Sequence, residues 1–334
     1  MRKIKIKFLD FWSGFDYNTF IIYKLLVRSY NVIIAEDPDY IVFSMFGHEH
    51  LNYPKAIKIY YTGENVVPDF NLCDYAIGYE YLEYGDRYLR FPDYYGDTYK
   101  DDMLRCEEKH IDSVKVINDK SEFCSFVYSN RQAAEIRDRL LIEISKYKKV
   151  NSGGRHLNNI GCPNGVEDKL EFQYKHKFAI ACENSSHSGY TTEKLVQAFA
   201  ARTIPIYWGD PKVKKVFNEK AFICVSDYPT IDALVEEIRR IDEDNLEYCR
   251  MLAEPALVDK AYALDNMRRD LELFLLSIFE QSKNDAYRRN MEFYGWKYQT
   301  NMKFKEEFVD KYIKLVDSRP AKALFWLHKK LKKL

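Results

Sequence analysis

The residues of this 334-residue chain that could carry out chemistry gather in one segment, residues 174–209. An apolar stretch at 178–181 leads into a polar turn, and a helical pattern at 192–202 and a second apolar stretch at 204–207 follow. In open α/β sheets, ligands bind beyond the carboxyl ends of strands, at helix N-termini. The turn and the first helical turn hold Glu183, Asn184, Tyr190, Thr192, Glu193 and Lys194. The pattern indicates a site for an anionic ligand, although a first-turn acid that only stabilises the helix would explain Glu193 equally well.

The elements around this segment predict an α/β fold. In the first third of the chain, strands are expected at 4–8, 32–34, 40–43, 56–61 and 74–78, with a helix over 18–29. A second series begins with a strand at 123–127 and a helix at 133–147, and it ends with a strand at 221–225 and a helix at 230–241. Strands separated by helices imply parallel sheets. The sequence therefore predicts two successive Rossmann-like halves.

Composition narrows the class of protein. Lys plus Arg and Asp plus Glu each number 51, and this balance disfavours a nucleic-acid-binding protein. The seven cysteines include no C-x-x-C pair, which indicates reduced thiols rather than a disulfide framework or a zinc site. The sequence shows neither a signal peptide nor an apolar run of about 18 residues. We therefore expect a cytoplasmic chain.

Two blocks of residues resemble a known family. The first is Glu183-Asn184, Tyr190-Thr191-Thr192-Glu193-Lys194, Ala198 and residues 205–209; the second comprises residues 60–65, 68–70, 74–78 and 86–90. Together they resemble the bacterial α-1,3-fucosyltransferase family, whose members are inverting and use GDP-fucose. The chain departs from the family pattern at Cys182, where Phe commonly precedes Glu-Asn. We expect this difference to alter packing more than chemistry.

The resemblance implies a GT-B fold, with two Rossmann-like domains facing a cleft. It assigns residues 1–120 to acceptor binding and 121–275 to GDP-fucose binding, followed by a helical segment at 276–318 and a basic tail at 319–334. Fucose would pass to the O3 atom of N-acetylglucosamine in a β-galactosyl-N-acetylglucosamine acceptor, as in Lewis-type glycans of lipopolysaccharide or in protein glycosylation. Two alternatives stay open. One is an α-1,4 or other-acceptor fucosyltransferase, and the other is a non-catalytic protein of the same fold that binds sugar nucleotides or glycans.

The reaction that the resemblance implies assigns roles to two acids. An inverting transfer needs a base beside the acceptor hydroxyl. Glu64, followed by Asn65 in the acceptor half, is the expected base, and its alternative role is to cap the turn at Gly63. Glu193 is expected to face the fucose and to stabilise positive charge on the ring, because it would repel the diphosphate.

The leaving diphosphate needs positive charge, and Lys194 and Arg137 are the expected cations. Arg131 competes with Arg137, for which a solvated helix position is a further alternative. Glu183, Asn184, Tyr190 and Thr192 complete the predicted substrate site. No cofactor and no protein-bound metal are expected, although a divalent ion such as Mn²⁺ could stimulate transfer without a dedicated site.

Three further segments carry weaker signals. The run Gly47-His48-Glu49-His50 lacks the ligand spacing of a metal site and favours a solvated loop. Residues 153–155, Gly-Gly-Arg, predict a flexible loop that could close over the nucleotide. The tail at 319–334 holds six Lys or Arg and no acid, with leucines at helical spacing. It predicts a basic amphipathic helix in peripheral contact with an anionic membrane at its inner face, or else a terminal helix that packs on the body.

Overall fold

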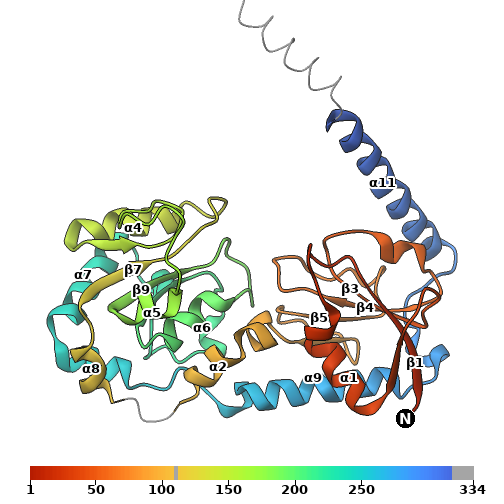
Figure 1. The fold of residues 1–334 in the computed structure, drawn as a ribbon, viewed down its shortest axis with the longest axis horizontal. Coiled ribbons are helices and arrows are strands. Elements are labelled where there is room, and N and C mark those ends of the chain that lie inside the picture. The colour runs from red at the N-terminus through yellow and green to blue at the C-terminus, as the bar shows by residue number, and fades with distance from the viewer. Residues whose placement is uncertain (109–111, 318–334) are drawn as a thin grey trace, which may run out of the picture.

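The computed structural model describes residues 1–108 and 112–317, which form two α/β domains side by side (Figure 1). The first domain contains a parallel sheet with the strand order β2-β1-β3-β4-β5-β6. Its strands are β1 (Lys3–Leu9), β2 (Asn31–Ile34), β3 (Tyr40–Phe43), β4 (Ile57–Tyr61), β5 (Tyr75–Gly78) and β6 (Tyr88–Arg90). Every residue of β3, β4 and β5 is buried, as expected for a parallel sheet covered on both faces.

The second domain contains a smaller parallel sheet with the order β11-β10-β9-β7-β8. Its strands are β7 (Glu122–Phe126), β8 (Val150–Ser152), β9 (His176–Cys182), β10 (Ile204–Trp208) and β11 (Ile223–Cys224). The two predicted Rossmann-like halves are therefore present. The sequence did not reveal β6 and β8, because each is a three-residue edge strand, too short to show a period.

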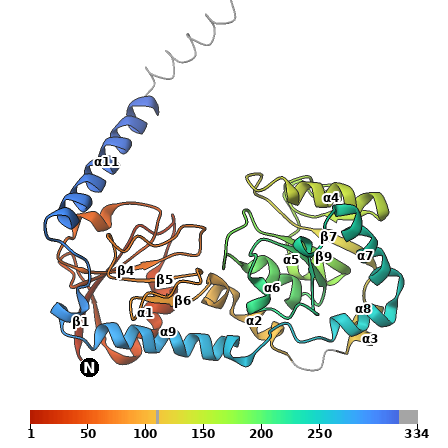
Figure 2. The same cartoon turned by 180° about the vertical axis from the view of Figure 1, so that it is seen from behind.

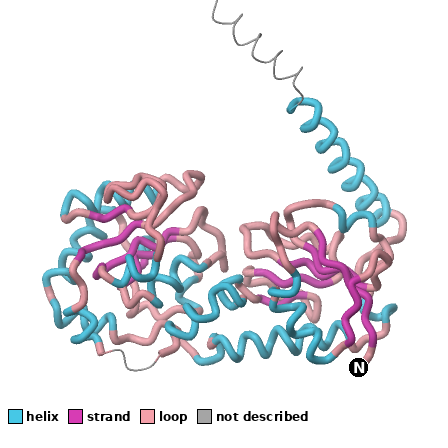
Figure 3. The backbone as a smooth tube through the Cα atoms, viewed as in Figure 1, coloured by secondary structure: helices cyan, strands magenta, loops and turns pink. Residues whose placement is uncertain are grey.

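Helices cover the sheets (Figure 3), and in the second domain α4, α5 and α6 also separate the strands from β7 to β10, whereas in the described part of the first domain α1 alone of the α-helices lies between two strands. In the second domain α4 packs against α7, while α6 packs on α5 and α2. Helix α7 begins where Thr230 Oγ1 accepts from Ala233 N at 3.1 Å, a typical N-cap. The helices are α1 (Ile21–Ser29), α2 (Lys100–Cys106), α3 (Ser113–Asn118), α4 (Ile136–Tyr147), α5 (Lys169–Tyr174), α6 (Glu193–Ala200), α7 (Ile231–Glu243), α8 (Asn245–Leu252), α9 (Leu264–Phe279), α10 (Lys283–Ala286) and α11 (Tyr294–Asp317).

The chain crosses between the domains twice. Helix α2 lies between them, and α9 runs back along the base of both, as the views from the front and from behind agree (Figures 1 and 2). Phe279 at the end of α9 packs on Tyr40 of the first domain, with ring centroids 4.4 Å apart. The predicted boundary at residue 275 thus falls inside a helix that has already returned to the first domain.

Helix α11 projects from the first domain (Figure 1). The predicted basic tail at 319–334 lies outside the described residues. Within the described ranges, none of the helices combines the length and the apolar character needed to span a membrane.

A buried ion cluster fastens the segment after α10 to the first sheet. Arg289 Nε donates to Asp74 Oδ2 at 2.9 Å, and both side chains are fully buried. Asp74 also accepts from the backbone N–H groups of Lys58, Arg288 and Arg289 at 2.7–2.8 Å, while Arg289 Nη2 donates to the carbonyl oxygen of Ala56 at 2.6 Å. Burial, with the like charge of Arg289, lowers the pKa of Lys58 to about 7.

Candidate functional site

The turn after β9 is tied to the start of α6 by a buried carboxylate. Glu183, which follows β9, accepts from Thr192 N at 2.8 Å and from Thr192 Oγ1 at 2.6 Å. Gly209, just after β10, makes room for it, because a Cβ atom there would lie 2.4 Å from Glu183 Cγ. The predicted motif thus has a physical basis: its glycine lets the acid reach the helix start.

Lys194 lies between two carboxylates. Its Nζ is 3.2 Å from Glu183 Oε2, 3.2 Å from Glu193 Oε1 and 2.8 Å from Thr192 Oγ1. An ammonium group has three donors, so protein acceptors already surround this one. Although burial alone would lower the pKa of Lys194, Glu183 and Glu193 raise it, and the group stays charged. To donate to a phosphate, Lys194 must exchange one of these partners.

Arg137 lies in the first turn of α4 and is 1% exposed, which excludes the solvated helix position considered above. Its Nη2 donates to Asn130 O at 2.7 Å, and its guanidinium lies 4.7 Å from the ring centroid of Tyr128. Within the described chain, its Nη1 is buried without a hydrogen-bond partner. An unfilled buried donor is costly, so this atom is suited to an anionic ligand. The competing Arg131 is exposed.

Backbone and side-chain contacts hold the loops of this site in place. Ala134 N donates to Asn184 O at 2.9 Å and joins the loop that precedes α4 to the turn after β9. Asp210 is buried, and its Oδ1 accepts from Gly189 N at 2.7 Å. The Tyr190 ring is buried in an edge-to-face contact with Tyr79 of the first domain, with centroids 5.2 Å apart. The loop that precedes α4 and the turn after β9 are therefore held against each other, and Tyr190 packs against the first domain.

Glu64 and Asn65 follow β4 and face this loop across the domain boundary. Asn65 Nδ2 donates to Ser185 Oγ at 2.6 Å, and Asn65 Oδ1 accepts from Tyr79 OH at 2.7 Å. Burial, and next the charge of Glu64, raise the pKa of Tyr190, so Glu64 lies near the loop that carries Tyr190. The carboxylate of Glu64 is exposed and makes no hydrogen bond to the described chain. Its backbone N–H closes the turn by donating to Thr62 Oγ1 at 3.0 Å, so the side chain is not the cap.

The structure adds residues that the sequence did not single out. Asp93, after β6, accepts from Tyr61 OH at 2.7 Å, and burial raises the pKa of Asp93, with the charge of Glu193 adding to the shift. Lys169, the first residue of α5, donates to Gln197 of α6 at 2.7 Å. Gln197 lies one turn after Glu193, and this spacing could have indicated it. Asp93 follows β6 and Lys169 begins α5. Both elements are too short to show a hydrophobic period, so no sequence pattern pointed to either residue.

The predicted flexible loop at 153–155 is packed instead. A Cβ atom at Gly154 would lie 2.0 Å from Tyr128 O, which explains why glycine stands there. His156 N donates to the same carbonyl oxygen at 2.9 Å, and His156 Nε2 lies 2.8 Å from Asp138 Oδ2. The loop is held against the segment that leads to Arg137.

The histidine run at 48–50 is not a solvated loop throughout. His50 is buried, and its Nδ1 lies 2.7 Å from Asp10 Oδ2. His48 Nε2 lies 3.5 Å from Oδ2 of Asp310 in α11. Within residues 1–108 and 112–317, no group of three or more His, Cys, Asp or Glu side chains is arranged to hold a metal ion.

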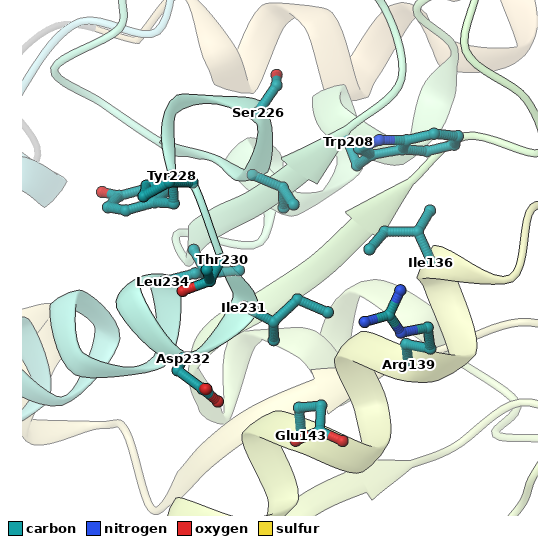
Figure 4. A pocket seen from close by; sticks show the side chains of 12 residues that line it. Ile136, Arg139, Glu143, Trp208, Ser226, Tyr228, Thr230, Ile231, Asp232 and Leu234 are labelled. Atoms are coloured by element: carbon teal, nitrogen blue, oxygen red, sulfur yellow. The ribbon is translucent and has the colours of Figure 1, made fainter.

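An opening with a volume of about 590 Å³ lies where α4 and α7 meet the ends of β10 and β11 (Figure 4). Its lining includes the Trp208 and Tyr228 rings and the charged side chains of Arg139, Glu143 and Asp232. It adjoins the turn after β9, because Trp208 O accepts from Glu183 N at 2.8 Å. The predicted donor residues lie outside its lining, so it is separate from the carboxylate cluster at α6.

Two family models match this sequence. Residues 6–96 match the alpha-(1,3)-fucosyltransferase FucT N-terminal domain, and residues 117–253 match the C-terminal part of glycosyltransferase family 10 (fucosyltransferase). The alpha-(1,3)-fucosyltransferase FucT of Helicobacter pylori is 34% identical over 304 residues, which cover 79% of this chain and 63% of that protein. The match therefore spans slightly less than two thirds of that relative's length.

Solved structures agree with the family models. A crystal structure of an α1,3-fucosyltransferase has a TM-score of 0.75 and 30% sequence identity, covering 87% of this chain and 93% of the other. A complex of α1,3-fucosyltransferase with GDP-fucose has a TM-score of 0.67 and 29% identity, covering 82% and 91%. The predicted GT-B fold is confirmed by these matches.

Proposed function

Because this chain belongs to the α-1,3-fucosyltransferases of glycosyltransferase family 10, we propose that it transfers L-fucose from GDP-fucose to the O3 atom of N-acetylglucosamine in a β-galactosyl-N-acetylglucosamine acceptor. One juxtaposition supports this proposal most directly. An exposed acid of the first domain, Glu64, faces a donor loop of the second domain that leads to Glu193, Lys194 and the start of α6. A protein that only binds sugar nucleotides has no need of a free acid on the acceptor side.

The proposed reaction inverts the configuration at fucose C1. Glu64 takes the proton of the acceptor hydroxyl. At the same time the oxygen of that hydroxyl forms a bond to C1, and the bond from C1 to the GDP oxygen breaks. Glu193, at the start of α6, stabilises the positive charge that develops on the ring. The N-terminus of α6, the free Nη1 of Arg137 and the charge of Lys194 hold the departing diphosphate.

We also propose that transfer needs no resident metal, since Arg137, Lys194 and a helix N-terminus supply positive charge toward the leaving group. The test is GDP release after treatment with EDTA. Retained turnover supports the proposal, and turnover that is lost and then restored by Mn²⁺ contradicts it.

A further proposal concerns the cellular location, which we take to be cytoplasmic with peripheral contact at the inner face of an anionic membrane through residues 319–334. The composition of that segment, basic with spaced leucines, supports this proposal. Deleting 319–334 should release the protein from phosphatidylglycerol vesicles without stopping transfer to a soluble acceptor. Vesicle binding that persists after the deletion would contradict the proposal.

The function is tested by GDP release from GDP-fucose, with and without N-acetyllactosamine, and with GDP-mannose as the control donor. Release that requires both GDP-fucose and the acceptor supports the proposal, and NMR of the product separates the α-1,3 from the α-1,4 linkage. Saturable GDP-fucose binding without release, across a panel of acceptors, would favour a non-catalytic binding protein. No binding of either nucleotide sugar would refute the donor assignment.

A further inference from the structure

A row of hydrogen-bonded polar side chains joins α5 and α6 to α2, the helix between the domains. Lys169 Nζ donates to Gln197 Oε1 at 2.7 Å, and Gln197 Nε2 donates to Asp102 Oδ2 at 3.1 Å. Gln197 lies four residues after Glu193 and therefore on the same face of α6. Asp102 belongs to α2, the helix that leads out of the first domain. The row thus connects α5, α6 and α2, and its middle member, Gln197, lies one helical turn after the acid that we assign to the sugar.

The balance of charge around Glu193 depends on Lys169. Burial alone would raise the pKa of Glu193, but Lys194, and next Lys169, lower it. The Lys194 ammonium is shared between Glu183 and Glu193, at 3.2 Å from each, so it compensates only one of the two charges. The other titratable or charged groups near Glu193 and its two lysines are Glu183, Asp93, Tyr99, Asp102 and Tyr190.

Lys169 is therefore the second cation in a cluster whose carboxylates outnumber its lysines. It forms no direct ion pair with Glu193 in the described chain, so it acts through its field and through the helices that it joins. Burial lowers the pKa of Lys169 itself, and Glu193, Glu183 and Asp102 offset only part of the cost of burying its ammonium.

We infer that Lys169 is a positioning residue for the transfer reaction: fixed by Gln197, which in turn donates to Asp102, its ammonium offsets the charge of Glu193 beside the donor sugar. This inference rests on the proposed function. It leads to a specific expectation, because a residue that acts through Glu193 should lose its importance once Glu193 carries no charge. A residue that contacts the diphosphate directly should keep its importance.

The test is a double-mutant cycle on the full chain, using kcat/KM for GDP-fucose with N-acetyllactosamine. Lys169→Met, which keeps a long unbranched side chain but removes the charge, should lower kcat/KM by about tenfold in the wild-type background, and by less than about twofold in a Glu193→Gln background, since groups in one network couple. Lys169→Arg should restore most of the loss. Equal losses in both backgrounds, or no loss in the first, would overturn the inference.

A matched control separates this effect from loss of stability. Lys120 is another lysine of the second domain whose pKa burial lowers, to about 7, and its Nζ donates to the carbonyl oxygens of Tyr174 at 2.5 Å and Ala201 at 3.4 Å. Lys120→Met should lower the melting temperature with no coupling to Glu193→Gln. A Lys120→Met variant that couples as strongly would mean that the cycle reports stability alone.

The pH profile decides the matter if Glu193→Gln is too slow to measure. Without Lys169, Glu193 takes up a proton more readily, so the acid limb of kcat/KM should move to higher pH in Lys169→Met and return in Lys169→Arg. An unmoved limb would count against the inference. Failure of the proposed function is distinguishable, because the wild-type protein would then transfer no fucose in the same assay.

Discussion

The two domains each bury a cluster of charged side chains, but the clusters differ in how they are satisfied. In the first domain, Asp74 and Arg289 are fully buried and their partners are backbone groups and each other. In the second domain, Glu183 is equally buried, but Lys194 and Glu193 lie at a helix N-terminus at the carboxyl ends of the strands. There, the nearby Arg137 also keeps an unfilled donor.

Burial of charge therefore does not by itself mark a functional site in this protein. The cluster of Asp74 and Arg289, here called the closed cluster, joins the segment after α10 to the first sheet. The cluster of Glu183, Glu193 and Lys194, here called the open cluster, leaves the nearby N–H donor of Arg137 Nη1 and the N-terminus of α6 for a ligand. Removing a charge should accordingly affect unfolding in the first domain and ligand binding or turnover in the second.

The largest effect is expected from a residue outside both clusters. Glu64→Gln removes the proposed base and should lower turnover by about 10²- to 10⁴-fold, while leaving GDP affinity unchanged. Because Glu64 is exposed, the fold should be unaffected. GDP release gives the rate, and calorimetric titration with GDP gives the affinity. Turnover at the wild-type rate would remove Glu64 from the mechanism.

In the closed cluster, Arg289→Met leaves Asp74 buried without its ion pair. The free energy of unfolding should fall by about 3–5 kcal/mol, as measured by urea titration. The neighbouring Arg288, whose Nη2 pairs with Asp86 at 2.6 Å near the surface, provides the control. Arg288→Met should cost about 1 kcal/mol or less. Similar losses for the two variants, or a reduced kcat in the folded Arg289→Met protein, would break the comparison between the domains.

Arg137 lies near the open cluster, in the first turn of α4. Arg137→Lys keeps the positive charge but removes the Nη1 donor, which is unpaired within the described residues. A hydrogen bond to a charged group contributes about 1.5–3 kcal/mol, so the Kd for GDP should rise at least tenfold while guanosine binding is unchanged. Arg131→Lys, at the exposed competing position, should leave both affinities unchanged. If the Arg131 variant is the one that loses GDP affinity, the phosphate assignment moves to that residue.

The smallest effect is a dependence of stability on pH. Lys58 has a folded-state pKa of about 7, below the ordinary value of 10.5, so the unfolded chain binds the extra proton between these values. The free energy of unfolding should therefore rise as pH increases above 7, by up to about 1.4 kcal/mol per pH unit. Lys58→Met should remove the contribution of Lys58 to this pH dependence. The rise in the free energy of unfolding between pH 6.5 and 8.5 should then be smaller than in the wild type by about 1–2 kcal/mol. Identical rises in the two proteins would contradict the assignment.

The sequence predicted the fold well where periods are long enough to read. Strands such as β3 and β4, and the turn from β9 into α6, lie within a residue or two of their expected positions. The structure brings Glu183, Thr192, Glu193 and Lys194 into contact beyond the end of β9, and the rule on strand ends and helix N-termini that predicts a site there needs no knowledge of contacts. Their individual roles stay predictions.

Contacts between distant segments could not be read from the sequence. Nothing local distinguishes a solvated Arg137 from one buried over Tyr128, and nothing links Lys169 to Gln197 before the helices pack. The cluster of Asp74 with Arg289 joins residues more than 200 positions apart. The packed glycine at 154 looked like a flexible loop because the sequence does not show which backbone approaches it.

The return of α9 along the base of both domains has a consequence for engineering. The half of the molecule that carries Glu64 is discontinuous in sequence, because it comprises the first sheet together with the end of α9 and the segment around Arg289. A chimaera that exchanges only the N-terminal part of the chain with a relative would therefore join foreign surfaces inside one core. To graft a new acceptor preference, both segments must be transplanted together.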